Sequence, residues 1–126
     1  MEMPLLQMLS MTKEFRGGRV LQEVNFSLAR GEVCALVGQN GAGKSTLMKI
    51  LGGVYRDYGG SIQIDGQRVA LHDPRTAIAE GVAIIYQDFT LVPHLSVAEN
   101  IALGREPSGR FPGTIDHRRP PPVVPT

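Results

Sequence analysis

The middle of the chain contains the segment Gly38-Gln39-Asn40-Gly41-Ala42-Gly43-Lys44-Ser45. This segment matches the pattern G-x-x-x-x-G-K-[S/T], in which glycines precede a lysine and a hydroxyl residue. Because glycine has no Cβ, the backbone of such a loop can wrap closely, and several N–H groups can converge on one anion. The segment therefore predicts a phosphate-binding loop.

Two side chains at the end of the loop carry the predicted chemistry. The Lys44 ammonium is a mobile point charge for the β- and γ-phosphates of a nucleotide, and the Ser45 hydroxyl is placed to ligate Mg²⁺. A helix that starts near Gly43 adds the partial positive charge of its N-terminus at the same place. The alternative is a glycine-rich turn that matches the pattern by accident.

The segments on either side of the loop favour the phosphate-binding interpretation. Residues 33–37 are apolar at every position, as expected for a strand that is covered on both faces in a parallel sheet. After the loop, Leu47, Ile50 and Leu51 recur at helical spacing, and Gly52-Gly53 ends the helix. The order strand, loop, helix predicts an α/β fold of the P-loop NTPase class.

The segments before residue 33 and from 61 to 69 predict strands joined by tight turns. Residues 5–11 form a plausible first strand and residues 24–28 alternate apolar and polar side chains, with a turn at Gly17-Gly18 between them. Residues 61–69 predict a hairpin that turns at Asp65-Gly66. This part of the chain is therefore expected to form an antiparallel β subdomain.

Two further helices and one strand follow. A helix begins at Asp73-Pro74 and ends at Gly81, because aspartate caps and proline suits the first helical position. Residues 82–86 predict a second apolar strand. Ser96 and Glu99 have the capping-box spacing for a short helix that runs to Leu103.

Composition excludes several functional classes. With 13 basic and 12 acidic residues the net charge is +1, which gives no sign of a nucleic-acid or membrane surface. The single cysteine, Cys34, excludes an internal disulfide and a multi-cysteine zinc site, and its apolar neighbours predict that it is buried. No signal peptide and no apolar run near the ~20 residues of a membrane span are found, so a cytoplasmic location is expected.

The last part of the chain has a different character. Six of the nine prolines lie between Pro107 and Thr126, and no apolar periodicity is found there. We therefore predict a partial nucleotide-binding domain over residues 1–104 and a Pro/Arg-rich disordered tail over 105–126.

Residues 37–47 resemble the Walker A segment of ATP-binding cassette (ABC) proteins, and residues 21–32 resemble the run that precedes it in that family. Gln87 follows three apolar or aromatic residues and lies 43 residues after Lys44, as the Q-loop glutamine of the family does. The resemblance extends over residues 5–106. It implies a RecA-like core, here truncated, beside the antiparallel β subdomain.

The resemblance also implies roles for single residues. Phe15 matches the aromatic A-loop residue that stacks on adenine, although an ordinary aromatic of a β segment is the alternative. Gln87 matches the residue that contacts Mg²⁺ and the attacking water, and its alternative is an ordinary polar residue at a strand end. Asp88 stands where the family has glutamate. Lys44 and Gln87 are then the catalytic candidates, and Ser45 and Gln87 the Mg²⁺ ligands. The residues expected to bind ATP are Phe15, Gly38, Asn40, Gly41, Ala42, Gly43, Lys44, Ser45 and Thr46.

Within the family, residues 96–106 are similar to the first cassette of the double-cassette ATPases that drive bacterial import of monosaccharides such as ribose, galactose and xylose, and so are residues 84–88 followed by 91–93. Amino-acid and lipoprotein importers share part of this pattern. The resemblance implies transmembrane permease subunits and a second cassette as partners. It also implies a location at the inner face of the membrane when the chain is assembled with them.

Several family features are not found in the sequence: the Walker B strand with its Asp-Glu, the Leu-Ser-Gly-Gly-Gln signature and the switch histidine. Hydrolysis by the isolated chain is therefore not expected, and the Pro/Arg-rich ending is interpreted as a frameshifted or prematurely ended reading frame. Two alternatives stay open. One is a remnant that binds nucleotide weakly or not at all, and the other is a small P-loop kinase or GTPase, for which no guanine-reading or Arg-rich lid motif is found.

Overall fold

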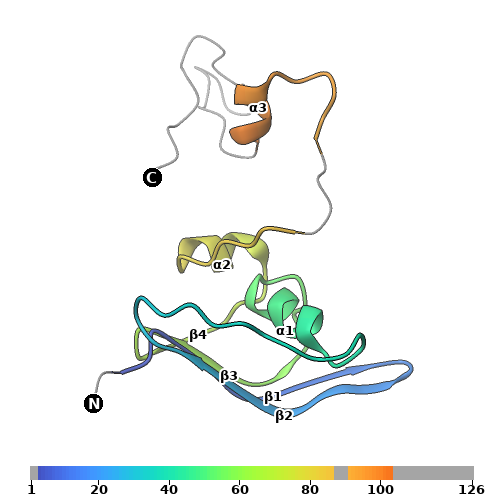
Figure 1. Ribbon diagram of the computed structural model, residues 1–126, viewed down its shortest axis with the longest axis vertical. Helices are drawn as coiled ribbons and strands as arrows, with labels where there is room; N and C mark the ends of the chain where they lie inside the picture. The colour runs from blue at the N-terminus through green and yellow to red at the C-terminus, as the bar shows by residue number, and fades with distance from the viewer. Residues whose placement is uncertain (1–2, 87–90, 104–126) are drawn as a thin grey trace. The chain divides into compact units, whose positions relative to one another are not determined.

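The computed structural model describes residues 3–86 and 91–103 of the chain, which divides into two units, one up to Ile85 and one from Tyr86 onward. The first unit contains a four-stranded sheet in the order β2-β1-β3-β4 (Figure 1). Its strands are β1 (Leu6–Phe15), β2 (Gly18–Leu28), β3 (Gly59–Ile64) and β4 (Gln67–Val69). Every neighbouring pair is antiparallel, which confirms the predicted antiparallel subdomain.

Local turn chemistry sets the two hairpins. The first hairpin turns at Arg16 and Gly17, one residue before the predicted turn at Gly17-Gly18. The second hairpin turns at Asp65 and Gly66 as predicted. Asp65 and Gly66 have φ angles of 53° and 77°, the left-handed values that a two-residue type I′ turn requires. The turn is tied to the start of β1, since the Asp65 N–H donates to the Leu5 carbonyl at 2.8 Å.

An irregularity in β1 decides which side chains face the core. Ser10 has a φ of 52°, and the pairing of β1 with both neighbours shifts between residues 8 and 12. The Ser10 N–H donates instead to Oδ1 of Asn25 at 2.8 Å. Because the bulge adds one residue, burial changes from even positions at Leu6 and Met8 to odd positions at Met11 and Lys13.

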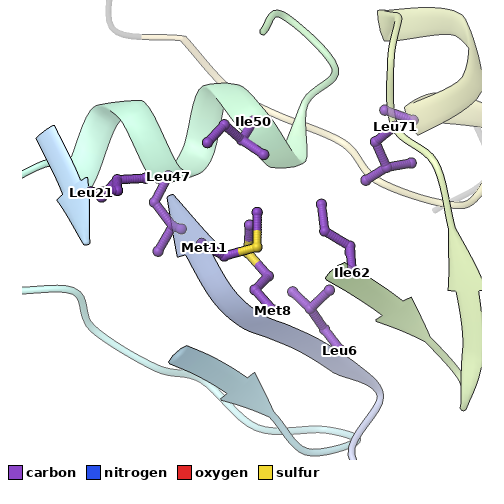
Figure 2. Close-up of a cluster of buried hydrophobic side chains, with 9 residues drawn as sticks. Leu6, Met8, Met11, Leu21, Leu47, Ile50, Ile62 and Leu71 are labelled. Carbon is purple, nitrogen blue, oxygen red and sulfur yellow. The ribbon is translucent and has the colours of Figure 1, made fainter. Parts of the chain in front are cut away.

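Two helices cover one face of this sheet (Figure 1). Helix α1 (Lys44–Leu51) buries Leu47 and Ile50, and helix α2 (Pro74–Ala79) buries Ala77. Figure 2 shows the side chains of α1 directed at those of β1 and β3. The buried cluster consists of Leu6, Met8, Met11, Leu21, Leu47, Ile50, Ile62, Leu71 and Ala77.

The ends of the helices agree with the predicted caps. Helix α1 is followed by Gly52 and Gly53, and Gly53 has a left-handed φ of 77°. A Cβ at Gly53 would lie 2.3 Å from the Asp73 carbonyl oxygen, so the end of α1 packs closely on the start of α2. Asp73 caps α2 by accepting a hydrogen bond from the Thr76 N–H at 2.8 Å.

Two predicted strands are not formed. Across the part of the chain that the structure describes, residues 33–37 and 82–86 belong to no helix and pair with no strand. Val33 and Val37 are 98% and 89% exposed, and Ile85 is 92% exposed. The physical reason is that an apolar run becomes a buried strand only when neighbouring strands pair with it and helices cover it.

The prediction for Cys34 is wrong for the same reason. Its side chain is exposed, because the run around it has no covering layer. The apolar residues next to Cys34 in the sequence predict burial only where the sheet around them is complete. They do not bury the thiol in this fold.

The second unit is described only at Tyr86 and over residues 91–103. Helix α3 (Val97–Ile101) begins with the predicted capping box, in which the Glu99 N–H donates to Ser96 Oγ at 3.3 Å and the Ser96 N–H donates to Glu99 Oε2 at 2.8 Å. The Asn100 amide closes the segment before α3 by donating to the carbonyls of Val92 and Leu95. Among the described residues, no helix has the length and apolarity that crossing a membrane requires.

Candidate nucleotide-binding site

The glycine-rich segment forms a loop that leads directly into α1. The loop surrounds a hollow of about 240 Å³. Gly41 and Gly43 have φ angles of 86° and 92°, so both adopt a left-handed conformation that side chains disfavour. The hollow is lined by Val20, Gln39, Asn40, Gly41, Ala42, Gly43, Lys44, Ser45 and Thr46. Seven of the predicted ATP-binding residues therefore lie together.

Lys44 folds back over this loop. Its ammonium donates hydrogen bonds to the carbonyl oxygens of Gly38 and of Gln39, the latter at 3.1 Å. A Cβ at Gly38 would lie 3.3 Å from the Ala42 Cβ and 3.7 Å from the Lys44 Nζ, so a side chain there would crowd the loop. The arrangement brings one positive charge to the inside of a tightly curved backbone.

The N-terminus of α1 faces the same hollow without a side-chain cap. Its N-cap is Gly43, no side chain accepts from the first-turn N–H groups, and the first turn contains no acidic residue. The unsatisfied N–H groups of a helix start carry partial positive charge, which favours an anion. The loop and helix end together fit a phosphate group.

Contacts with β2 hold the loop against the sheet. A Cβ at Gly43 would lie 2.6 Å from Cδ2 of the buried Leu21, so the loop backbone rests directly on that side chain. Val20, the preceding residue, lines the hollow. Sequence reasoning missed Val20 and Gln39 as lining residues. Gln39 could have been included as a member of the motif, whereas nothing in the sequence marks Val20.

Phe15 lies at the last position of β1, beside the turn into β2, and it does not line the hollow. The residue is 39% exposed, and its ring packs edge-on against Tyr55, with the two centroids 5.3 Å apart. The Lys13 ammonium lies 4.7 Å from the centroid of the Phe15 ring. Sequence reasoning missed both neighbours, although Lys13 stands two residues before Phe15 on the same strand.

Some of the remaining predicted site residues lie in the described part of the chain and others lie outside it. Ser45 is exposed and Thr46 half-buried on the first turn of α1, next to Lys44. Gln87, predicted as both a catalytic residue and a Mg²⁺ ligand, lies outside the described residues, as do Asp88 and the predicted tail 105–126. The roles of all these residues remain predictions.

A glycine loop that opens into a helix N-terminus, with a lysine folded over it, defines a P-loop NTPase site. The family model described as ABC transporter matches residues 21–120, and the chain belongs to this family.

Several relatives are named as sugar importers. The chain is 53% identical over 112 residues to a putative ribose/galactose/methyl galactoside import ATP-binding protein from Burkholderia ambifaria. This alignment covers 89% of this chain and 22% of that protein. It is 55% identical over 105 residues to an arabinose import ATP-binding protein from Chromohalobacter salexigens, covering 83% of this chain and 21% of the relative. The chain thus spans about a fifth of the length of these relatives.

Solved structures show the same fold. A nucleotide-free ATP-binding cassette from an ABC transporter aligns with a TM-score of 0.74 at 25% identity, over 87% of this chain and 44% of that one. A bacterial Atm1-family ABC exporter with ATP bound aligns with a TM-score of 0.68 at 33% identity, over 85% of this chain and 19% of that one. The α/β P-loop NTPase fold with an antiparallel subdomain is therefore confirmed.

Proposed function

We propose that this chain binds ATP with Mg²⁺ through the loop of residues 38–45. The observation that supports this most directly is the hollow where Lys44 and the uncapped start of α1 meet. A triphosphate would offer the Lys44 ammonium anionic oxygens in place of two neutral carbonyls, and charge-assisted hydrogen bonds are stronger than neutral ones. The loop backbone would hold the β-phosphate.

Other residues complete the proposed site. Ser45 would ligate Mg²⁺, which neutralises charge on the β- and γ-phosphates when it is bound. Gln87 would be the second ligand and would contact the attacking water. The exposed ring of Phe15 would stack on adenine. Lys44 would stabilise the charge that develops on the transferred phosphoryl group.

The relatives named above suggest the physiological setting. We propose that the intact protein powers the import of a monosaccharide together with transmembrane permease subunits and a second cassette, at the inner face of the membrane. The support is the similarity to relatives named as ribose/galactose and arabinose importers. The division of the chain into a partial nucleotide-binding domain over residues 1–104 and a tail over residues 105–126 is also a proposal.

The test of nucleotide binding compares Lys44 with an exposed basic residue outside the loop. We expect Lys44→Ala to abolish ATP binding, measured by titration calorimetry with Mg²⁺ present, because it removes the charge over the loop. Arg68→Ala, which removes one exposed positive charge from β4, should leave the affinity unchanged. Unchanged affinity in Lys44→Ala would remove Lys44 from the site. Competition by GTP and AMP as strong as by ATP would favour a kinase or GTPase instead.

A further inference from the structure

A buried lysine lies beside the aromatic residue proposed to stack on adenine. Lys13 is only 3% exposed, and its ammonium forms an ion pair with Asp57 Oδ1 at 2.8 Å. The same ammonium lies 4.7 Å from the Phe15 ring centroid and 5.2 Å from the Tyr55 ring centroid. We call Lys13, Phe15, Tyr55 and Asp57 the Phe15 cluster.

Within the Phe15 cluster, Lys13 and Tyr55 contact the Phe15 ring while the residue stays 39% exposed. The two ring planes meet at 72°, and one ammonium lies over both rings. An exposed aromatic ring held by its neighbours in this way is suited to stacking on a planar base.

The position of the Phe15 cluster relates it to the phosphate loop. Phe15 pairs with Gly18 across the β1–β2 turn, and Val20, two residues farther along β2, lines the hollow. Tyr55 follows α1, the helix that begins at the loop. The cluster therefore connects the tip of the first hairpin with the segment that leaves the loop helix.

Packing alone does not account for a lysine at this position. Burying an ammonium is unfavourable unless it is paired, and an apolar side chain of similar length would fill the space without that penalty. Met11, an apolar side chain of similar length, occupies the preceding buried position of the same strand. The interactions that lysine adds are the ion pair with Asp57 and the cation–π contacts with the two rings.

We propose that Lys13 and Tyr55 are positioning residues that hold the Phe15 ring in place to stack on the base of the bound nucleotide. The inference rests on the proposed ATP binding and adds to it the residues that determine recognition of the base. Asp57, whose side chain is 85% exposed, anchors the ammonium from the solvent side.

The experiment separates base recognition from phosphate binding in the full 126-residue chain. Affinities for Mg-ATP and for Mg-tripolyphosphate, which has no base, are measured for wild type, Lys13→Met, Tyr55→Leu and Phe15→Ala. Because base–aromatic stacking contributes about 1–3 kcal/mol, Phe15→Ala should weaken ATP binding about 5-fold or more. We expect Lys13→Met and Tyr55→Leu to weaken it several-fold as well, while all three variants bind tripolyphosphate as wild type does.

Two controls show whether Lys13 acts through Phe15. Arg68→Met removes one exposed positive charge from β4 of the same sheet and should change neither affinity. The double variant Lys13→Met/Phe15→Ala should bind ATP no more weakly than Phe15→Ala alone, because the ring through which Lys13 acts is already gone.

Each outcome decides the proposal. Wild-type affinity for ATP in both Lys13→Met and Tyr55→Leu would overturn it. So would an equal loss of ATP and tripolyphosphate binding, since that would show a structural role for the whole fold. If wild type binds neither ligand, the proposed nucleotide binding fails first and this inference fails with it. Circular dichroism shows whether each variant folds. If either Lys13→Met or Tyr55→Leu does not fold, the affinities of the other variant test the proposal.

Discussion

Gly43 is the residue where the loop, the helix and the sheet meet. Its φ of 92° is left-handed, and a Cβ built there would lie 2.6 Å from the Leu21 side chain and 3.3 Å from the Val20 carbonyl oxygen. Both features exclude a side chain, one through backbone strain and the other through overlap. The glycine that lets the loop curve is thus also the glycine that lets it rest on β2.

We predict that Gly43→Ala destabilises the fold by about 1–3 kcal/mol, the usual effect of a non-glycine residue in an unfavourable backbone region, with overlap adding to it. Urea unfolding followed by circular dichroism measures the change. Gly17→Ala is the matched control, because Gly17 has no left-handed φ and nothing lies within 4 Å of its added Cβ. Equal stability of Gly43→Ala and Gly17→Ala would show that the loop does not rest on Leu21.

At the scale of elements, the start of α2 depends on one carboxylate. Asp73 accepts from the Thr76 backbone N–H and from Thr76 Oγ1, both at 2.8 Å. The hydrogen bond from the Thr76 N–H, followed by that from its hydroxyl, lowers the pKa of Asp73 below its ordinary value. Since the folded state holds this proton less tightly than the unfolded state, the carboxylate stabilises the fold above the unfolded pKa of about 3.9.

We therefore predict a pH-dependent effect of Asp73→Ala. The variant should unfold at a lower urea concentration than wild type at neutral pH. The difference should shrink as the pH falls below about 3.9 and through the lower folded pKa, where wild type also loses the charged cap. Glu80→Ala, at the exposed far end of the same helix, should show neither effect. A difference between wild type and Asp73→Ala that stays constant down to strongly acidic pH would contradict the ionic cap.

At the scale of the whole molecule, two apolar segments without strand partners, residues 33–37 and 82–86, affect how the chain is expected to behave in solution. Among the described residues, neither segment pairs with a strand, and apolar side chains such as Val33 and Ile85 are exposed. In folds resembling this family, the Walker B strand and the switch-histidine strand lie between these two segments. Exposed edges of this kind are aggregation sites, so we expect poor solubility.

Hydrogen exchange should separate the paired from the unpaired segments. We predict fast amide exchange in residues 33–37 and 83–86 and slower exchange in β1 and β3, because β1 and β3 each pair with a strand on both sides. Val82 is left out because its N–H donates to the Ala77 carbonyl at 2.9 Å. The measurement is amide exchange by mass spectrometry at a protein concentration where the chain is monomeric. Slow exchange throughout both unpaired segments would mean that the chain forms a core which the structure does not contain.

The isolated chain is predicted to release no phosphate from ATP above background. A bound triphosphate would meet Lys44 and the loop, but the sequence supplies neither the Walker B carboxylate that polarises water nor the signature loop of a partner cassette. A phosphate-release assay with Mg-ATP makes the comparison, with Lys44→Ala as the control for contaminating enzymes. Turnover by wild type that disappears in Lys44→Ala would show that hydrolysis needs neither the Walker B carboxylate nor the signature loop.

The features predicted correctly from the sequence are those that form within a few residues. The turn at Asp65-Gly66, the Asp73 cap and the capping box of Ser96 and Glu99 satisfy their own hydrogen bonds locally. The loop of residues 38–43 also belongs here, because its glycines permit the curvature by themselves. Membership of the ABC family follows from the same local motifs.

Only the tertiary structure decided the features that need distant partners. Residues 33–37 have the composition of a buried strand, yet they stay unpaired and Cys34 stays exposed, because interstrand hydrogen bonds and covering helices must come from elsewhere in the chain. The burial of Lys13 depends on the bulge at Ser10, on Tyr55 and on Asp57. The sequence by itself determined the phosphate loop, since its chemistry is local, whereas the surroundings of Phe15 are set by residues about 40 positions away in the chain.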